Sequence, residues 1–82
     1  MTYRQKFVDM YTLQLRKAVE TRPDLYSWPV SEVPTVVAKM VKALEMGSYN
    51  KGGLGMQWTC KALGIKYTYA SINSYFSDQS EV

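Results

Sequence analysis

The spacing of apolar side chains along the first quarter of the chain constrains the fold most. From Thr2 to Thr21 these side chains recur on one side at about 100° per residue, and polar side chains occupy the other side. Thr2 suits an N-terminal cap, and Pro23 disfavours helical geometry in the residue before it. The pattern predicts an amphipathic helix over 2–21, which must bury its apolar face against the rest of the chain or against a second copy.

Three shorter helices are expected after the first, and no segment alternates as a strand would. The second begins near Ser31 with Pro34 in its first turn, where a missing N–H does no harm. The third covers 54–63 and has apolar residues on two sides, which predicts packing on both. The fourth covers 68–76.

The segment between the first two helices predicts a structured loop. Residues 23–33 contain two prolines and show no helical period. Leu25, Tyr26 and Trp28 should fold back on the core, because a small domain rarely leaves three such side chains in water.

These elements predict an all-α fold, a compact bundle of about four short helices. The 82 residues should form a single domain, 1–82, and their 46% hydrophobic share is ordinary for a globular protein. Residues 76–82 are expected to fray as a tail. The longest apolar run is Val36-Val37-Ala38, far shorter than a membrane span, so no membrane association is expected.

Histidine is absent from the chain, and cysteine occurs once, as Cys60. These counts exclude a Ser-His-Asp or Cys-His relay, a Cys/His zinc site and a disulfide within the chain. The carboxylates are scattered, and none pairs at a spacing that implies a shared site. We therefore expect a protein that is not an enzyme and has no cofactor or metal, with Cys60 as a small buried hydrophobic side chain.

The net charge is +3, and the positive charge gathers in the middle third of the chain, where five lysines face one acidic residue. Two of them, Lys39 and Lys42, fit the solvated side of the second helix. The other three, Lys51, Lys61 and Lys66, flank the motif described next and could hold a phosphate backbone.

A sharp helix ending is indicated after the third helix. The small residue Cys60 lies midway along this helix, and Leu63 and Ile65 flank Gly64 at its end. Gly64 can supply the positive φ of the ending, and a small side chain at Cys60 lets two helices cross closely. With these residues, the segment from Met56 to Phe76 resembles the helix-turn-helix of DNA-binding proteins.

The resemblance implies a helix-turn-helix-like C-terminal pair, with double-stranded DNA as partner and the last helix as the reading element. A helix-turn-helix with a turn of the usual length has an apolar residue at the position of Asn73, which is polar here. The apolar residues Ile72 and Tyr75 take the buried positions only if the turn is about two residues longer. The reading helix offers no cation beyond Lys66, although Asn73 could pair with an adenine. The residues implied to contact DNA are Lys51, Lys61, Lys66, Tyr67, Thr68, Ser71, Asn73 and Ser74.

The sequence thus supports two functions. The first is a small DNA-binding protein with a regulatory or accessory role. The alternative is a protein–protein interaction module or inhibitor that docks on a larger host protein through exposed tyrosines, such as Tyr49 and Tyr67, and a helix face. A homodimer paired through the first helix is compatible with either function.

The origin of the chain is suggested by its overall character. A short, basic, single-domain chain rich in Tyr and Met is similar to small accessory proteins of tailed bacteriophages. With an unpaired Cys60 and no export signal, we expect it in the cytoplasm of a bacterial cell.

Overall fold

The computed structural model describes residues 3–47 and 53–77, and every regular element within these two ranges is helical. The helices are α1 at Tyr3–Thr21, η1 (a short 3-10 helix) at Val30–Glu32, α2 at Val33–Glu45, α3 at Gly53–Leu63 and α4 at Tyr69–Ser77. The predicted all-α fold with four helices is therefore confirmed. None of the described helices is long and apolar enough to cross a lipid bilayer.

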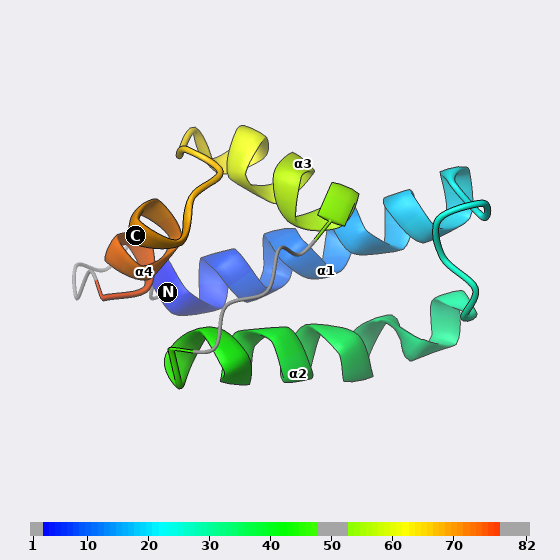
Figure 1. Cartoon of the computed structure of the whole chain (residues 1–82), viewed down its shortest axis with the longest axis horizontal. Coiled ribbons are helices and arrows are strands. Elements are labelled where there is room, and N and C mark those ends of the chain that lie inside the picture. Colours follow the sequence, from blue (N-terminus) through cyan, green and yellow to red (C-terminus); the bar gives the residue numbers. More distant parts are fainter. Residues whose placement is uncertain (1–2, 48–52, 78–82) are drawn as a thin grey trace.

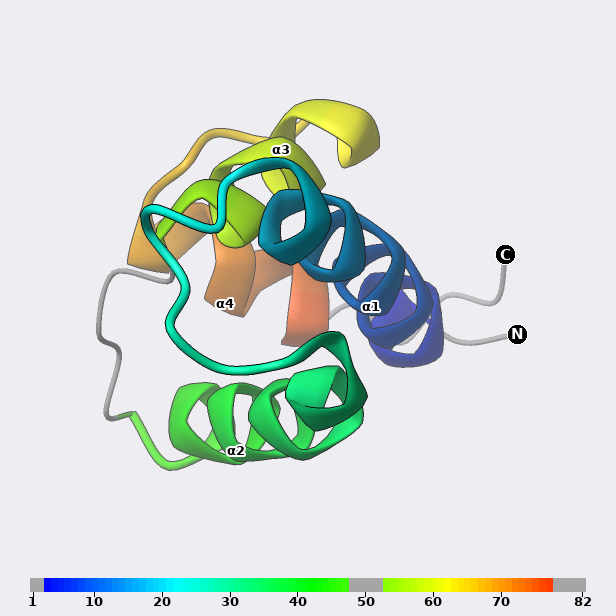
Figure 2. The same cartoon turned by 90° about the vertical axis from the view of Figure 1, so that its right-hand side faces the viewer.

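Helix α1 is the central element of the bundle. Helix α2 runs antiparallel to it on one side, α3 lies on the other side, and α4 lies next to the start of α1 (Figure 1). Each of these three helices packs mainly against α1. A view along the long axis shows α2 on one side of the other three helices, with the connection between α1 and α2 crossing one end of the molecule (Figure 2). The apolar face of α1 is thus covered by the chain's own helices.

The core is formed by residues that repeat every three or four positions on each helix, so each helix buries one face. Helix α1 contributes Phe7, Tyr11 and Leu15, and α2 contributes its valines and Leu44. The buried hydrophobic residues are Phe7, Tyr11, Leu15, Ala18, Val19, Val33, Val37, Val41, Leu44, Met56, Cys60 and Ile72. The amphipathic patterns predicted for the first, second and fourth helices are confirmed.

Helix α4 is attached to the start of α1 by aromatic side chains. The rings of Phe7 and Phe76 meet edge to face at 4.8 Å, and those of Tyr3 and Tyr75 at 4.9 Å. Phe76 was expected both to end the fourth helix and to begin the tail, and it lies within α4, with its ring packed on α1. The rest of that tail, 78–82, lies outside the described residues.

Helix α3 crosses α1 at Gly55. A side-chain carbon placed on Gly55 would lie 3.1 Å from the Cα atom of Leu15, so the two backbones approach as only glycine allows. Thr59, one turn later, is also buried, and its hydroxyl donates to the Gly55 carbonyl at 2.7 Å. The buried face of α3 is therefore centred on small residues.

This crossing corrects the prediction that α3 packs on two sides. Leu54 and Trp58 are only half-buried and Ala62 is exposed, although these three form an apolar stripe. The close approach at Gly55 turns the neighbouring face toward α1 and leaves this stripe at the edge of the contact.

The connection between α1 and α2 follows its prediction except at Leu25. Tyr26 and Trp28 are half-buried, and their rings pack edge to face at 5.5 Å. Leu25 is 56% exposed, so its expected burial is wrong. The Leu25 N–H donates to the Arg22 carbonyl at 3.0 Å and closes a turn, which the ion pair between Arg22 and Asp24 also spans. This turn leaves the Leu25 side chain on the outside of the chain's corner.

Candidate nucleic-acid interface

The corner after α3 has the geometry that Gly64 predicts. Gly64 has a φ of +72°. The Ile65 N–H donates to the Cys60 carbonyl at 3.0 Å, and the Gly64 N–H donates to the Lys61 carbonyl at 3.3 Å. These two bonds satisfy the last carbonyls of α3 and stop the helix in a left-handed turn.

The turn between α3 and α4 is long, as the apolar register requires. Residues 64–68 separate the two helices. With this length Ile72 is fully buried and Asn73 is exposed. Helices α3 and α4 each pack mainly on α1, and the contact between the two helices themselves is slight.

Two predicted contact residues, Thr68 and Ser71, form the start of α4. The Ser71 N–H donates to the Thr68 hydroxyl oxygen at 3.2 Å, and the Thr68 hydroxyl donates to that of Ser71 at 3.0 Å. The Ile72 N–H donates to the Thr68 carbonyl at 3.0 Å. Thr68 is therefore the N-terminal cap of α4, a role that satisfies an N–H group at the helix start.

Tyr67 was expected to be exposed but is half-buried. Its ring packs against the core, and its hydroxyl donates to the Gly53 carbonyl at 3.3 Å. From the other side, the Tyr26 hydroxyl accepts the Gly55 N–H at 3.3 Å. Two tyrosines from different loops thus hold the first turn of α3. No sequence signal could have revealed this, because the partners are 14 and 29 residues apart.

The outward face of α4 carries short side chains. Ala70, Asn73 and Ser74 are exposed, and Ser71 lies at the border of this face. A surface hollow brings Lys66 together with Ser71 and Ser74, and its other lining residues are Ile65, Ala70 and Tyr75. A helix face without long side chains can approach a groove wall closely.

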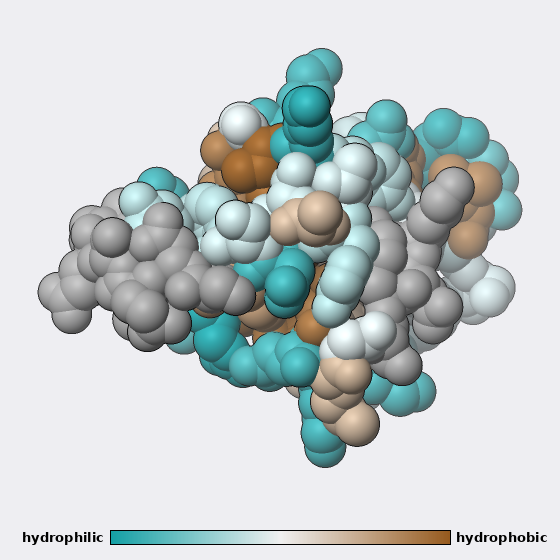
Figure 3. All heavy atoms as spheres, turned by 60° about the vertical axis from the view of Figure 1, so that its left-hand side comes forward, coloured by the Kyte–Doolittle hydropathy of each residue, from teal (hydrophilic) through white to brown (hydrophobic). Residues whose placement is uncertain are grey.

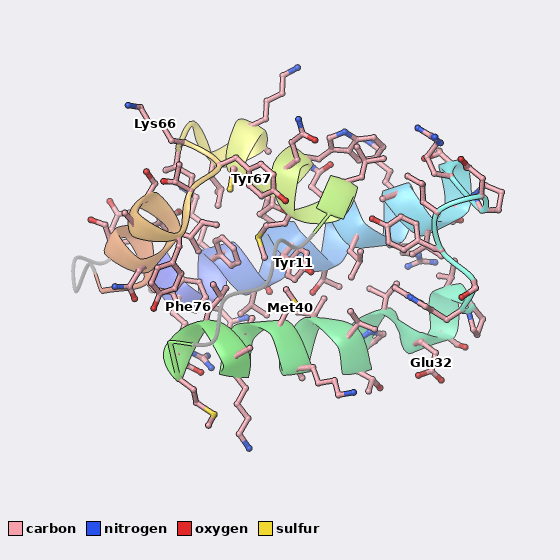
Figure 4. The ribbon with its side chains drawn as sticks, viewed as in Figure 1. Tyr11, Glu32, Met40, Lys66, Tyr67 and Phe76 are labelled. Atoms are coloured by element: carbon pink, nitrogen blue, oxygen red, sulfur yellow. The ribbon has the colours of Figure 1, made fainter. Side chains whose placement is uncertain are left out.

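Lys66 lines the hollow beside this face, and Lys61 is the basic residue in the last turn of α3. Both are exposed, and neither forms an ion pair with a described residue. The Lys66 side chain projects away from the body of the protein (Figure 4). When the α4 end is turned forward, hydrophilic and neutral side chains surround separate hydrophobic patches (Figure 3). Lys51, the third predicted phosphate contact, and Tyr49 lie outside the described residues.

Comparisons with protein-family models, with curated proteins and with solved structures found no match. The assignment of a site therefore rests on the geometry of this chain.

Cys60 is almost fully buried within the core. Burial raises the pKa of its thiol, because the thiolate is disfavoured away from water. In residues 3–47 and 53–77, no three Cys, Asp or Glu side chains come together as metal ligands would. Cys60 packs as a small hydrophobic side chain.

Proposed function

We propose that this chain is a small non-enzymatic DNA-binding protein that uses α3, the Gly64 corner and α4 as a helix-turn-helix-like element. The observation that carries the proposal is the outward face of α4, whose short polar side chains share a surface hollow with the exposed cation Lys66. A second exposed cation, Lys61, lies in the last turn of α3. Such a face can lie against a DNA groove while the lysines neutralise phosphates.

The candidate residues divide into two roles in this proposal. Lys61 and Lys66, together with Lys51, would contact phosphates, and Asn73 and Ser74 would reach base edges. Tyr67, Thr68 and Ser71 would act mainly by position, because their hydroxyl groups hold the starts of α3 and α4.

We further propose a regulatory or accessory role in the cytoplasm of a bacterial cell, of the kind that phage accessory proteins perform. The small basic chain and its unpaired, buried cysteine support this setting.

The test is a salt titration of binding to a fluorescent random duplex, beginning at about 50 mM salt. The double variant Lys61→Gln and Lys66→Gln should bind more weakly and lower the slope of log K against log salt by about 2, since each phosphate contact contributes about 0.9. The matched control is Lys39→Gln and Lys42→Gln, which removes the same charge from the exposed side of α2. This control should keep most of the slope.

Two results would overturn the proposal. One is no binding of the wild-type protein at the lowest salt concentration. The other is an equal loss of slope in the two double variants, which would indicate attraction by net charge without a defined site.

The alternative of docking through exposed tyrosines has less support in the structure than in the sequence. Of the six tyrosines in the described part of the chain, Tyr11 is buried and the other five are half-buried. A different surface, between α1 and α2, favours a protein partner.

A further inference from the structure

An apolar groove runs along the side of the molecule where α1 and α2 lie antiparallel. Its volume is about 580 Å³, and its floor is formed by Val8 of α1 and by Pro34, Val37 and Val41 of α2. The backbones of α1 and α3 close up at Gly55, but the side chains between α1 and α2 are mostly branched valines. This packing leaves the groove open between α1 and α2.

The groove is elongated. Thr12 and Pro34 line it and also line a smaller hollow that continues to Arg16 and Val30. Arg4 lines the opposite end. From Arg4 to Arg16 along α1 is a rise of about 18 Å, the length of a helical segment of about 12 residues.

The rim of the groove is mainly basic. The charged residues that line the groove and the hollows joined to it are Arg4, Arg16, Lys39, Lys42 and Glu45. Arg4 forms an ion pair with Glu45 at 3.0 Å, and Arg16 forms one with Glu20 at 3.9 Å. Lys39 and Lys42 pair with no carboxylate of the described chain. Lys42 gives one wall of the groove its positive charge, and Lys39 adds to it from the adjoining hollow.

An apolar floor with a basic wall specifies the chemistry of an occupant. Nucleic acid would match the wall but would leave the floor without partners, because phosphates do not bury apolar surface. A second copy of the chain is disfavoured, since none of α1–α4 carries a net negative charge. An amphipathic helix with apolar residues on one side and carboxylates beside them would satisfy both parts.

We infer that the α1–α2 groove is a docking site for an acidic amphipathic helix of a partner protein. Apolar side chains of that helix, spaced by three and four residues, rest on Val8, Pro34 and Ala38. Its carboxylates meet Lys39 and Lys42. The inference stands independently of DNA binding, because the groove shares no residue with the face of α4.

The experiment measures polarisation of a fluorescent helical peptide of about 14 residues. The probe has leucines at i, i+3, i+4 and i+7 flanked by glutamates, and a scrambled peptide of equal composition is the reference. The wild-type protein should bind the amphipathic peptide at least about tenfold more tightly than the scrambled one.

Two variants test the floor and the wall separately. Lys39→Glu with Lys42→Glu turns two attractions into two repulsions and should weaken binding about tenfold. Ala38→Trp fills the groove at an exposed position and should abolish binding without touching a charge. The variant Lys61→Glu with Lys66→Glu, which makes the same change of charge elsewhere, is the matched control and should bind the peptide as the wild type does. Thermal unfolding followed by circular dichroism checks that each variant is folded.

Three outcomes would overturn the inference. The first is equal binding of the amphipathic and scrambled peptides. The second is displacement of the peptide by duplex DNA that depends on Lys39 and Lys42, which would make the groove a nucleic-acid face. The third is a wild-type dimer in sedimentation that Ala38→Trp dissociates, which would make the occupant a second copy.

Discussion

Gly55 is the residue that sets the distance between α1 and α3. A side-chain carbon on it would lie 2.8 Å from the Leu15 Cδ1 atom and 3.1 Å from the Leu15 Cα atom. The side-chain end can rotate away, but the Cα atom can move only with the whole of α1. Glycine is otherwise a poor choice within a helix, where alanine is favoured by about 1 kcal/mol.

We expect Gly55→Ala to lower the free energy of unfolding by about 1 kcal/mol, because overpacking at this crossing exceeds the gain in helix propensity. Urea unfolding followed by circular dichroism measures the change. Gln57→Ala, at an exposed position of the same helix, is the control and should stay within about 0.5 kcal/mol of the wild type. A higher unfolding midpoint for Gly55→Ala would show that the two helices separate easily.

Among the elements, α4 depends most on contacts outside itself. Its nine residues include three serines, an asparagine and three aromatic residues, all weaker helix formers than alanine. A helix of this length is not stable alone in water. It is held by the Thr68 cap at one end and by the rings of Tyr75 and Phe76 on α1 toward the other.

Thr68→Ala should therefore destabilise α4 by about 1 kcal/mol. The measurement is native-state hydrogen exchange, in which the amides of α4 should exchange faster while those of α2 change little. Ser71→Ala keeps the N–H that Thr68 accepts and should have the smaller effect. Equal effects of the two substitutions would mean that the hydroxyl pair, and not the cap, holds the helix start.

At the scale of the whole molecule, Arg4 and Glu45 join the start of α1 to the end of α2. The guanidinium donates two hydrogen bonds to the carboxylate, at 3.0 Å and 3.2 Å, across 41 residues of sequence. The hydrogen bond from Arg4 holds the pKa of the Glu45 carboxyl below its ordinary value. Both side chains are nearly half exposed, so solvent screens the pair and its contribution stays below about 1 kcal/mol.

This ion pair gives a pH dependence of known sign. A carboxyl whose pKa is lower in the folded state stabilises that state above its unfolded pKa, and the contribution is lost as the pH falls through the folded value. Glu45→Gln should therefore be less stable than the wild type at about pH 7 and equal to it at about pH 3. Urea midpoints at the two pH values test this, and a difference that persists in acid would exclude the carboxylate as its cause.

The helices could be predicted because their signals are local. The expected bounds 54–63 and 68–76 differ by one residue from those of α3 and α4, and α1 ends at Thr21 as Pro23 requires. The positive φ of Gly64 could be predicted because it too has a local signal: glycine has no side chain and adopts positive φ readily. Periodicity, caps and glycines act within a few residues of one another.

The candidate interface could be predicted only in part. The sharp turn at Gly64 and the exposure of the polar residues of α4 follow from the sequence pattern. The hydrogen bonds that the Tyr67 and Thr68 hydroxyl groups form within the fold could not be predicted from it. The groove between α1 and α2 has no sequence signal at all. Its lining comes from two helices whose residues are tens of positions apart.

The sequence by itself determined an all-α chain of four helices without the side chains for histidine or paired-cysteine chemistry, because those properties depend on composition and on neighbours along the chain. Only the tertiary structure decided which faces meet. Gly55 brings α3 against α1 and leaves the Leu54–Trp58 stripe at the edge, and the turn at 22–25 leaves Leu25 in water. Such outcomes depend on the shape of surfaces distant in sequence, and periodicity along one helix does not contain that information.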